Sequence, residues 1–458
     1  MRASKMLKVV LFLGIALRVV LWCFQADPNG DDGARYLSES INMVKYHVFS
    51  TVSSVDPGVT PVPSAHDLPL WPSIMAVVYW LTDSVQATQY IAGAINIVLV
   101  LIAALFLIAM LKDRPFKFTD AQTAVAVAVL LFMPESVMYS LFHMPDQIAV
   151  TMVIVGLRFY FKSLDGNWKC LLGCATAFLA AIYSKPICIP LTFALLMAMP
   201  LIMSVRWKKR VPFVMCSILV VVLGLFPWTV RNRLAFGTSG LTSISGTNLY
   251  GCNWGRLVDR LPAEEKERVR SEMKKFENEI SGVDLMKRSK MVGKYARDQI
   301  LAHLHEYGIY TLKTHPRLYA GTGTVAMFRY LGAERICDAL DTMWGSGMSR
   351  GKIPHHDIPY STVEKSVGAS VQILSWIILG GGYILVFIGF IRGWDCIVCG
   401  ESRSNSKWFD RCVFLLPILS LLLLAAVIGP ITATRYRFIM IPFFSMLAGY
   451  AAMPRKIK

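Results

Sequence analysis

The sequence lacks the motifs by which many soluble enzymes are recognised. It has no HExxH zinc motif, no P-loop and no dinucleotide-binding fingerprint, and it has no zinc-finger or RNA-binding pattern. Charged residues are also scarce, because they make up 17% of the 458 residues whereas 55% are hydrophobic. Soluble domains rarely have this composition. The many long apolar runs instead predict an all-α polytopic membrane protein.

Acidic residues are outnumbered by basic ones, and the formal net charge is +17. On a soluble protein such a charge would suggest a nucleic-acid partner. Here the Lys and Arg residues fall in short clusters between apolar runs, and the topology of a membrane protein explains that pattern first. We therefore expect a lipid membrane as a partner and no nucleic acid.

The ten cysteines form no metal-binding pattern. Most lie inside the apolar runs and are interpreted as small apolar residues. Cys252 and Cys337 both lie in the predicted outer region and could form a disulfide there, although sequence alone does not show that they meet. Cys396 and Cys399 make a lone CxxC, which we interpret as structural or incidental because two ligands do not make a zinc site.

The apolar runs predict about ten membrane-spanning helices, with both termini in the cytoplasm. The first, 7–25, is interpreted as a retained helix, because no small-residue cleavage site of a signal peptide follows it. The other predicted spans are 86–111, 121–139, 146–162, 169–184, 186–204, 211–228, 367–391, 412–432 and 437–453. In this arrangement every inner loop carries Lys or Arg, as expected of cytoplasmic loops.

Residues 68–82 are apolar, but they are too short and too rich in proline to cross a membrane comfortably. We interpret them as a surface or re-entrant helix, because a further span here would place Lys112, Arg114 and Lys117 outside. The chain then divides into an N-terminal transmembrane module, 1–228, with a first outer loop, 26–85; a mostly helical outer region, 229–366; and C-terminal transmembrane helices, 367–458.

Two adjacent carboxylates, Asp31 and Asp32, follow the first span directly. From Leu37 onward the spacing of apolar residues predicts an amphipathic helix that lies along the membrane surface. Asp is also one of the best N-cap residues, so either carboxylate could serve only to start that helix. A cap and a catalytic role do not exclude each other.

The topology brings a set of polar side chains at the ends of spans to the outer surface. They are Asp31, Asp32, His66, Asp67, Glu135, His143, Asp146, Lys185, Arg231, Asn232, Arg435 and Arg437. Cations on this side oppose the positive-inside tendency and suggest an anion site, since a guanidinium suits phosphate. The alternatives are helix capping for Asp146 and lipid head-group contacts for the cations. A His-Asp pair such as His66-Asp67 is weak evidence for a metal, and we interpret 355–357 as a solvated loop.

Five stretches, in chain order, resemble the GT-C glycosyltransferases, most closely the family-39-like branch that includes protein O-mannosyltransferases and the lipid A aminoarabinose transferase. They are 32–36 (D-x-x-x-Y), 68–72 (LPLWP, similar to PPLYP), 184–186 (a basic residue followed by Pro), 227–232 with 246–250 (PW-x-x-RN), and 435–442 (RYR-x-x-x-x-P). The branch often has an acid directly after the first Asp. Here Gly33 stands in that place and the acid precedes it as Asp31, which leaves the division of labour between Asp31 and Asp32 open.

The resemblance implies a GT-C helical bundle and transfer of a sugar from a polyprenyl phosphate to a hydroxyl of a glycan, lipid or protein, outside the cytoplasm at the plasma (inner) membrane. Asp32 would be the general base, and Asp31, Asp146 or a divalent metal ion could assist it. The donor phosphate would bind Lys185, Arg231, Arg435 and Arg437, and Tyr36, His66 and Asn232 would belong to the same site. The alternatives are a polysaccharide polymerase or ligase that uses lipid-linked sugars, and a lipid or solute transporter, which would carry buried mid-span charges and a repeat.

Overall fold

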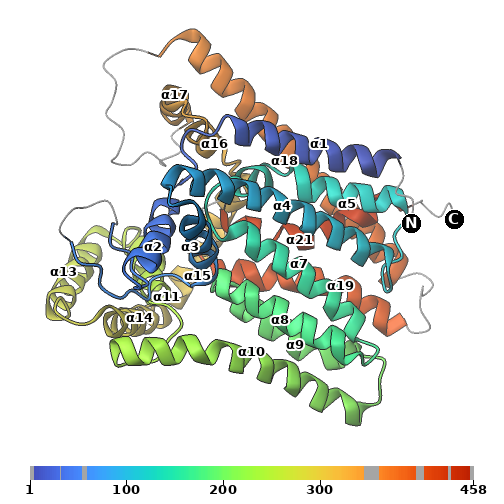
Figure 1. Cartoon of the computed structure of the whole chain (residues 1–458), viewed down its shortest axis with the longest axis horizontal. Coiled ribbons are helices and arrows are strands. Elements are labelled where there is room, and N and C mark those ends of the chain that lie inside the picture. Colours follow the sequence, from blue (N-terminus) through green and yellow to red (C-terminus); the bar gives the residue numbers. More distant parts are fainter. Residues whose placement is uncertain are drawn as a thin grey trace.

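The structure of the protein, a computed structural model, describes residues 5–30, 32–53, 59–344, 360–398, 407–431 and 435–453. Within these ranges the chain is helical and contains no strand. Ten helices run side by side and form a bundle (Figure 1). They are α1 (Lys5–Cys23), α4 (Val85–Lys112), α5 (Asp120–Phe132), α7 (Asp146–Ser163), α8 (Trp168–Ser184), α9 (Cys188–Ile202), α10 (Trp207–Phe236), α18 (Thr362–Gly393), α19 (Lys407–Ile428) and α21 (Ile441–Gly449).

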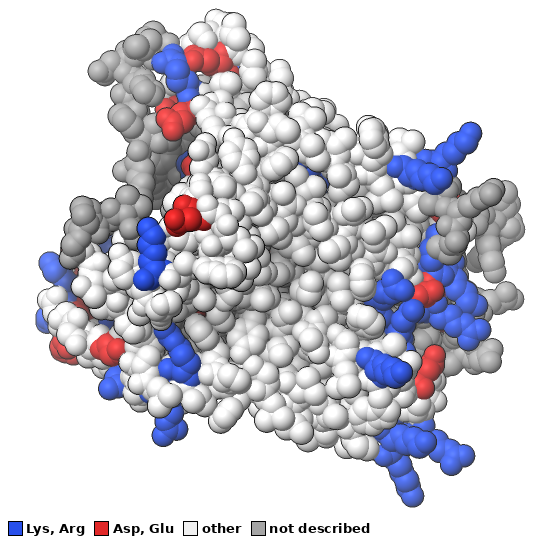
Figure 2. Space-filling model, in the orientation of Figure 1, with Lys and Arg blue, Asp and Glu red and all other residues white. Residues whose placement is uncertain are grey.

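The surface of the bundle identifies an integral membrane protein. Five described helices, α1, α4, α10, α18 and α19, are long and apolar enough to cross a membrane by length and composition. Their outer faces expose large apolar side chains, such as Phe12, Phe226 and Phe387, each more than 60% exposed. Figure 2 shows a belt with few charged residues across the middle of the visible face, and Lys and Arg residues gather at the end where α1 begins. Such a belt is what hydrocarbon requires of a protein surface.

Capping residues in the sequence explain where several bundle helices begin. The side chain of Ser84 accepts a hydrogen bond from the backbone N–H of Ala87 at the start of α4 (3.2 Å). Thr119 and Ser361 each form a reciprocal capping box, at the starts of α5 and α18. These signals lie at the polar borders of the apolar runs, so the predicted spans match the bundle helices in number and order.

Two of the differences between the predicted spans and the helices have a clear physical cause. The span predicted at 211–228 continues through Pro227 to Phe236, where Gly237 (φ 65°) takes the left-handed conformation that ends a helix at little cost. The span predicted at 121–139 is instead broken into α5 and a short α6 (Pro134–Tyr139), because Pro134 has no N–H for a continuous ladder.

A buried arginine closes this break inside the bundle. Arg18 of α1 is fully buried and donates to the free carbonyl of Leu131 at the end of α5 (2.9 Å) and to the hydroxyl of Ser140 (2.8 Å). In hydrocarbon an unpaired backbone group costs several kcal/mol, roughly, so this contact stabilises the broken helix. Arg18 therefore has a structural role in the bundle.

The remaining helices gather at the end of the bundle opposite the start of α1 (Figure 1). They are α2 (Gly33–Lys45), α3 (Leu70–Thr82), α11 (Ile244–Asn248), α12 (Arg256–Val258), α13 (Ala263–Glu279), α14 (Leu285–Ala302), α15 (Leu304–Ala320), α16 (Thr324–Tyr330) and α17 (Glu334–Trp344). The helices between α11 and α15 share a core of their own around Trp254 and Ala296, both fully buried. We call the end of the bundle that carries α2 and α3 the outer end.

Four further sequence interpretations can be compared with the structure. Cys252 and Cys337 are both free thiols, so the disulfide that the sequence left open is not formed. The sequence 355–357 and Cys399 of the CxxC lie outside the described residues. Residues 70–82 form the 13-residue helix α3, which packs on α2 and α4 at the outer end.

Candidate active site

The loop after α1 folds back onto the bundle and fixes the start of α2. The backbone N–H of His143 donates to the carbonyl of Pro28 (2.9 Å), and that of Gly33 donates to the carbonyl of Asn29 (2.7 Å). Gly33 lies so close to this junction that a Cβ there would sit 3.3 Å from the carbonyl oxygen of His143. This close approach explains why a glycine, and not an acid, follows Asp32. His143 is buried, and burial lowers its pKa to about 3, so its ring is neutral.

Asp32 occupies the N-cap position of α2, but its side chain makes no capping hydrogen bond. One carboxylate oxygen instead accepts from Nη1 of Arg35 (2.7 Å), and the other accepts from Nη1 of Arg435. Arg435 lies 403 residues further along the chain, so the contact depends on the tertiary fold. The carboxylate of Asp32 thus serves an ion-pair site. Asp31, its predicted partner, lies outside the described residues.

Two arginines control the charge of Asp32. Burial by itself would raise the pKa of this carboxyl, but the positive charges of Arg435 and Arg35 outweigh burial and hold the pKa well below its usual range. Asp32 is therefore ionised at neutral pH. While Arg435 remains bound to it, the carboxylate is also a weak base.

A second ion pair lies beside the first. Asp146, the first residue of α7, pairs with Nζ of Lys185, which directly follows α8. The ring of Tyr436 joins the two pairs, because its centroid lies 5.5 Å from Nζ of Lys185 and 5.3 Å from the guanidinium carbon of Arg435. We call Asp32, Asp146, Lys185 and Arg435 the four-charge cluster.

The four-charge cluster is reached by solvent but shielded from it. The side chains of Asp32, Lys185 and Arg435 are 19%, 14% and 20% exposed. Such partial burial strengthens electrostatic interactions while leaving a path for a ligand. Tyr36, one turn after Asp32, packs its buried ring 5.2 Å from the guanidinium carbon of Arg35. Burial, and then the charge of Asp67, raise the pKa of Tyr36 well above its usual value, so its hydroxyl keeps its proton.

Arg437, a predicted phosphate ligand, does not join the cluster. It is fully buried and pairs through Nε and Nη2 with both oxygens of Glu135 in α6 (2.6 and 2.7 Å). Its remaining donors reach the carbonyls of Leu318, Tyr319 and Gly321 (2.6–2.8 Å). All of its N–H groups thus have acceptors, and the side chain ties α6 and the end of α15 to the turn before α21. In this arrangement it offers no donor to a phosphate.

Arg437→Ala is expected to destabilise the protein by about 3–5 kcal/mol, because it leaves the buried carboxylate of Glu135 without its counter-ion. The measurement is the fraction of protein that stays folded and monodisperse in detergent over a denaturant or temperature series. Arg317→Ala, at an exposed position of α15, is the matched control and should change stability by no more than about 0.5 kcal/mol. Equal stability of the two variants would contradict a structural role for Arg437.

Arg231 and Asn232 bind each other and backbone groups around the first outer loop, and His66 lies beside Asp67 of that loop. Arg231 donates to the carbonyl of Ser64 (2.7 Å) and to Asn232 Oδ1 (2.9 Å), and the rings of Phe49, Trp228 and Phe236 surround its guanidinium at 5.0–5.7 Å. Asn232 in turn donates to the carbonyl of Gly240 (2.8 Å). These contacts join α10 to the first outer loop. A phosphate-binding role for Arg231 stays a prediction.

Two ionisable residues near Asp32 had escaped the sequence analysis. Arg35 binds Asp32 on one side and both oxygens of Asp67 on the other (2.5 and 3.2 Å). Glu39 is fully buried one turn later. Arg35 and Glu39 follow Asp32 by three and seven residues, a spacing that places all three on one face of a helix. This spacing is visible in the sequence and could have predicted that they lie together.

The described residues offer no evident metal site. No group of three or more His, Cys, Asp or Glu side chains suited to a metal occurs among them. The oxygens of Asp32 are engaged by arginines, and both oxygens of Asp67 are engaged by Arg35. We therefore derive no step through a metal ion.

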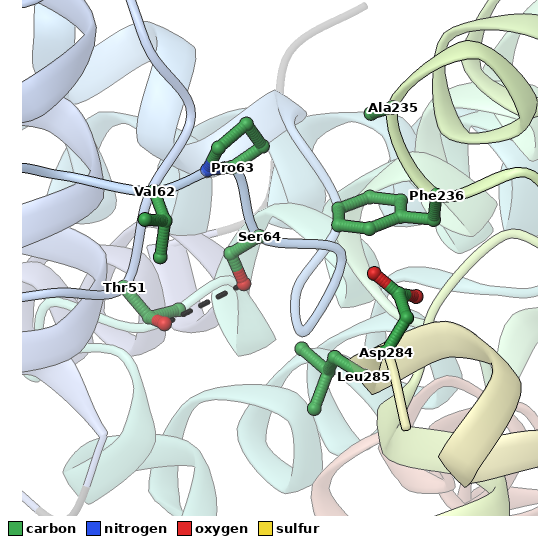
Figure 3. A pocket seen from close by; sticks show the side chains of 8 residues that line it. All are labelled: Thr51, Val62, Pro63, Ser64, Ala235, Phe236, Asp284 and Leu285. Atoms are coloured by element: carbon green, nitrogen blue, oxygen red, sulfur yellow. Dashed lines mark hydrogen bonds between the residues drawn. The ribbon is translucent and has the colours of Figure 1, made fainter. Parts of the chain in front are cut away.

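A cavity of about 350 Å³ opens beside this region, between the first outer loop and the start of α14 (Figure 3). Thr51 and Ser64 form one wall, with their hydroxyl oxygens 3.5 Å apart, and Phe236 and Asp284 form the other. None of the four charges of the cluster lines this cavity. It is close to Arg231, whose guanidinium packs on Phe236.

No family model matches the sequence, and no curated protein matches it. Among solved structures the chain is similar to the apo oligosaccharyltransferase of Archaeoglobus fulgidus, with a TM-score of 0.52 and 10% identity over 96% of this chain and 50% of that chain. It is also similar to ArnT from Cupriavidus metallidurans, in the apo state (TM-score 0.35, 15% identity, 96% and 76% covered) and bound to undecaprenyl phosphate (0.38, 14%, 98% and 78%). The chain thus spans about half the length of the oligosaccharyltransferase.

The likeness to the oligosaccharyltransferase shows a shared fold. The chain has the GT-C fold, and the prediction of an all-helical polytopic GT-C protein is confirmed. At 10% identity the likeness carries the fold alone, so the activity has to be argued from the side chains at the outer end.

Proposed function

We propose that this protein is a glycosyltransferase that moves a sugar from a polyprenyl phosphate to an acceptor hydroxyl at the extracytoplasmic face of the plasma membrane. The observation that carries the proposal is the four-charge cluster, in which Asp32, Asp146, Lys185 and Arg435 meet at the outer end of a GT-C bundle. Nucleotide sugars are cytoplasmic, so a transferase that faces outward needs a donor carried by a lipid. Such a donor presents its phosphate at the level of the head groups.

The two cations suit the leaving group of this reaction. As the acceptor oxygen attacks the anomeric carbon, the bond from that carbon to the phosphate oxygen breaks and the phosphate keeps the electron pair. Negative charge therefore grows on the phosphate in the transition state, and Lys185 and Arg435 are placed to stabilise it. Asp32 takes the proton of the acceptor hydroxyl as general base. A single displacement of this kind inverts the anomeric configuration.

Donor binding would also change the basicity of Asp32. Without a donor, the cations of the cluster are neutralised by Asp32 and Asp146. A phosphate that takes Arg435 removes from Asp32 the positive charge that does most to hold its pKa low. The pKa of Asp32 would then rise toward its ordinary value, and the carboxylate would become a better base only when the donor is in place. Lys185 and Arg435 carry this proposal, because they meet in the partly exposed cluster. All N–H groups of Arg437 are bound inside the bundle, and Arg231 donates to the carbonyl of Ser64.

A transfer assay tests the proposal. The purified protein, in lipid nanodiscs, receives polyprenyl-phosphate sugars with different hexosyl and pentosyl groups together with an extract of cell-envelope glycans, lipids and proteins. Release of polyprenyl phosphate and gain of one sugar by an acceptor, both followed by mass spectrometry, are expected. Comparison of surface glycans and lipids from cells with and without the gene should show the same single sugar lost. Absence of turnover with every donor, together with unchanged surface molecules, would overturn the proposal.

The proposed orientation places the outer end outside and both termini in the cytoplasm. A cysteine at the exposed Glu264 of α13 should react with a membrane-impermeant maleimide in intact cells, whereas one at the exposed Lys208 should react only after permeabilisation. The measurement uses a background in which accessible native cysteines are replaced by alanine. The reverse labelling pattern would contradict this orientation.

A further inference from the structure

One face of α2 carries ionisable side chains that continue the ion pairs of Asp32 into the protein. Arg35 follows Asp32 by three residues, and Glu39 follows Arg35 by four, a spacing that brings side chains of a helix together. Opposite this face lies Asp67, from the loop before α3. Arg35 joins Asp67 through two hydrogen bonds, from Nε to Oδ2 (2.5 Å) and from Nη2 to Oδ1 (3.2 Å). Arg35 is thus held between Asp67 and Asp32.

Glu39 stands at the inner end of this row and is not explained by the proposed reaction. Its side chain is fully buried, and neither carboxylate oxygen accepts a hydrogen bond from any described residue. Asp67, a second buried acid, lies close enough to raise the pKa of Glu39. Two buried carboxylates near one another are costly to charge together, so one of them holds a proton.

The partners of each acid decide which of them is protonated. Asp67 has Arg35 and the ring of His66, whose Nδ1 lies 3.1 Å from Oδ2. Its pKa stays below the usual range because these partners outweigh its burial. For Glu39, burial and then Asp67 raise the pKa well above the usual value. Glu39 receives no hydrogen bond from a described residue that would stabilise a negative charge, and it is therefore the acid that carries the proton.

We propose that Glu39 is a positioning residue for the base, which in its protonated form donates to Asp67 and so fixes the orientation in which Arg35 holds Asp32. This inference rests on the proposed role of Asp32. The row runs from Glu39 through Asp67 and Arg35 to Asp32. Arg35 is hydrogen-bonded to both aspartates, and Asp67 acts on the buried Glu39 through its charge. Once a donor phosphate has taken Arg435, Arg35 is the remaining ionic partner of Asp32 and alone sets its direction.

The proton on Glu39 also makes the row sensitive to pH. The charged or titratable groups that face Glu39 are Asp67 and His66 from the first outer loop, Arg35 from α2 and Arg231 from α10. As the pH rises through the raised pKa of Glu39, a second negative charge forms beside Asp67 and competes for Arg35. The folded state binds the proton more tightly than the unfolded chain, so stability falls as the pH rises above about 4.3.

Infrared spectroscopy tests the proton directly and needs no sugar donor. In nanodiscs at pH 7 the protein should show the carbonyl stretch of a protonated carboxylic acid, and Glu39→Gln should remove that band. Glu364→Gln is the matched control and should not remove it, because the carboxylate of Glu364 is paired with Arg335. Absence of a band that depends on Glu39 would overturn the inference, whether or not the protein transfers a sugar.

Activity then tests positioning as distinct from stability. Glu39→Leu removes the donor and should lower kcat by up to about 10²-fold, as expected when a reacting group is misplaced, with the KM for the donor little changed. Glu39→Gln keeps an N–H that donates to Asp67, so it should restore most of kcat and abolish the decline of rate at alkaline pH. Glu39→Leu with the kcat of the wild type, or Glu39→Gln as inactive as Glu39→Leu, would overturn the positioning role. Failure of the wild type to use any donor would instead overturn the proposed function, and the infrared result would still stand by itself.

Discussion

Asp32→Asn is expected to lower the rate of sugar transfer by about 10²–10⁴-fold while the protein remains folded in the membrane. This range is the usual contribution of a general base. Asn keeps the shape of the side chain and can still accept one hydrogen bond from Arg35 or Arg435, but it cannot take the proton of the acceptor hydroxyl. The expected loss is therefore in kcat, with donor binding close to normal.

The structure sharpens this experiment, because the side chain of Asp32 makes no capping hydrogen bond to α2. A loss of activity in Asp32→Asn would thus not reflect a lost N-cap. Asp32→Asn can still lower the stability of the fold for an electrostatic reason, because Arg35 and Arg435 would lie close together without the negative charge between them. That change should cost about 1–3 kcal/mol of stability, which thermal unfolding in detergent measures separately from turnover.

Asp27→Asn is the matched control for Asp32→Asn. Asp27 lies in the same loop, and its carboxylate accepts a hydrogen bond from the backbone N–H of Asn29 (3.2 Å), which Asn can also accept. Turnover of this variant should stay within a few fold of the wild type. If Asp32→Asn keeps the turnover of Asp27→Asn, Asp32 is not the base and the proposed mechanism fails at its centre.

The sequence allowed the bundle and the members of the four-charge cluster to be predicted, because both depend on where polar residues interrupt apolar runs. Asp32, Asp146, Lys185 and Arg435 each stand next to the outer end of a predicted span, and the positive-inside rule marked the two cations as unusual. Such placement along the chain says which end a residue occupies. It does not say which residue of that end is its partner.

Arg435 and Arg437 show the limit most clearly. Both were predicted to bind phosphate because they stand two residues apart in one turn, and nothing local distinguishes them. Arg435 reaches Asp32 in the first outer loop, whereas Arg437 points into the bundle and pairs with Glu135, 302 residues away. The choice depends on which helix packs against each side of the turn, and only the fold determines that.

Other differences come from residues whose local effect is overridden by packing. Pro227 does not end α10, because a helix within a membrane protein tolerates proline when neighbours satisfy the freed groups. Arg35 and Glu39 belong to a helix that the sequence predicts to lie along the membrane surface, but Arg35 is bound to Asp67 of the neighbouring loop and Glu39 is fully buried. A charged residue on an amphipathic helix is thus solvated or buried according to what lies across from it, and one sequence does not reveal that.

Arg435→Ala is expected to lower kcat by about 10²–10³-fold, the usual cost of removing one donor aimed at a developing charge. The effect should be on kcat more than on the KM for the donor, because the charge on the phosphate grows as its bond to the sugar breaks. Arg435→Lys should recover only part of the rate, since a point charge replaces a planar fork that can bind two oxygens. Arg233→Ala, at an exposed position near the outer end of α10, is the matched control and should change little.

The pH dependence of Arg435→Ala distinguishes two roles of Arg435, binding of the donor phosphate and control of the pKa of Asp32. A lower kcat alone does not distinguish them. In the wild type, Arg435 favours the ionised form of Asp32 and holds its pKa well below the usual range. Removal of that charge favours the protonated form, so the pKa of Asp32 in the donor-free enzyme rises, and the acid limb of the pH profile of kcat/KM should move to higher pH. In the double variant Asp32→Asn/Arg435→Ala, the loss of kcat, expressed as free energy, should be smaller than the sum of the losses in the two single variants. The reason is that the two residues act through one ion pair. A reduced kcat with an unmoved acid limb and additive losses would leave Arg435 as a phosphate ligand only, and would refute its control over the basicity of Asp32.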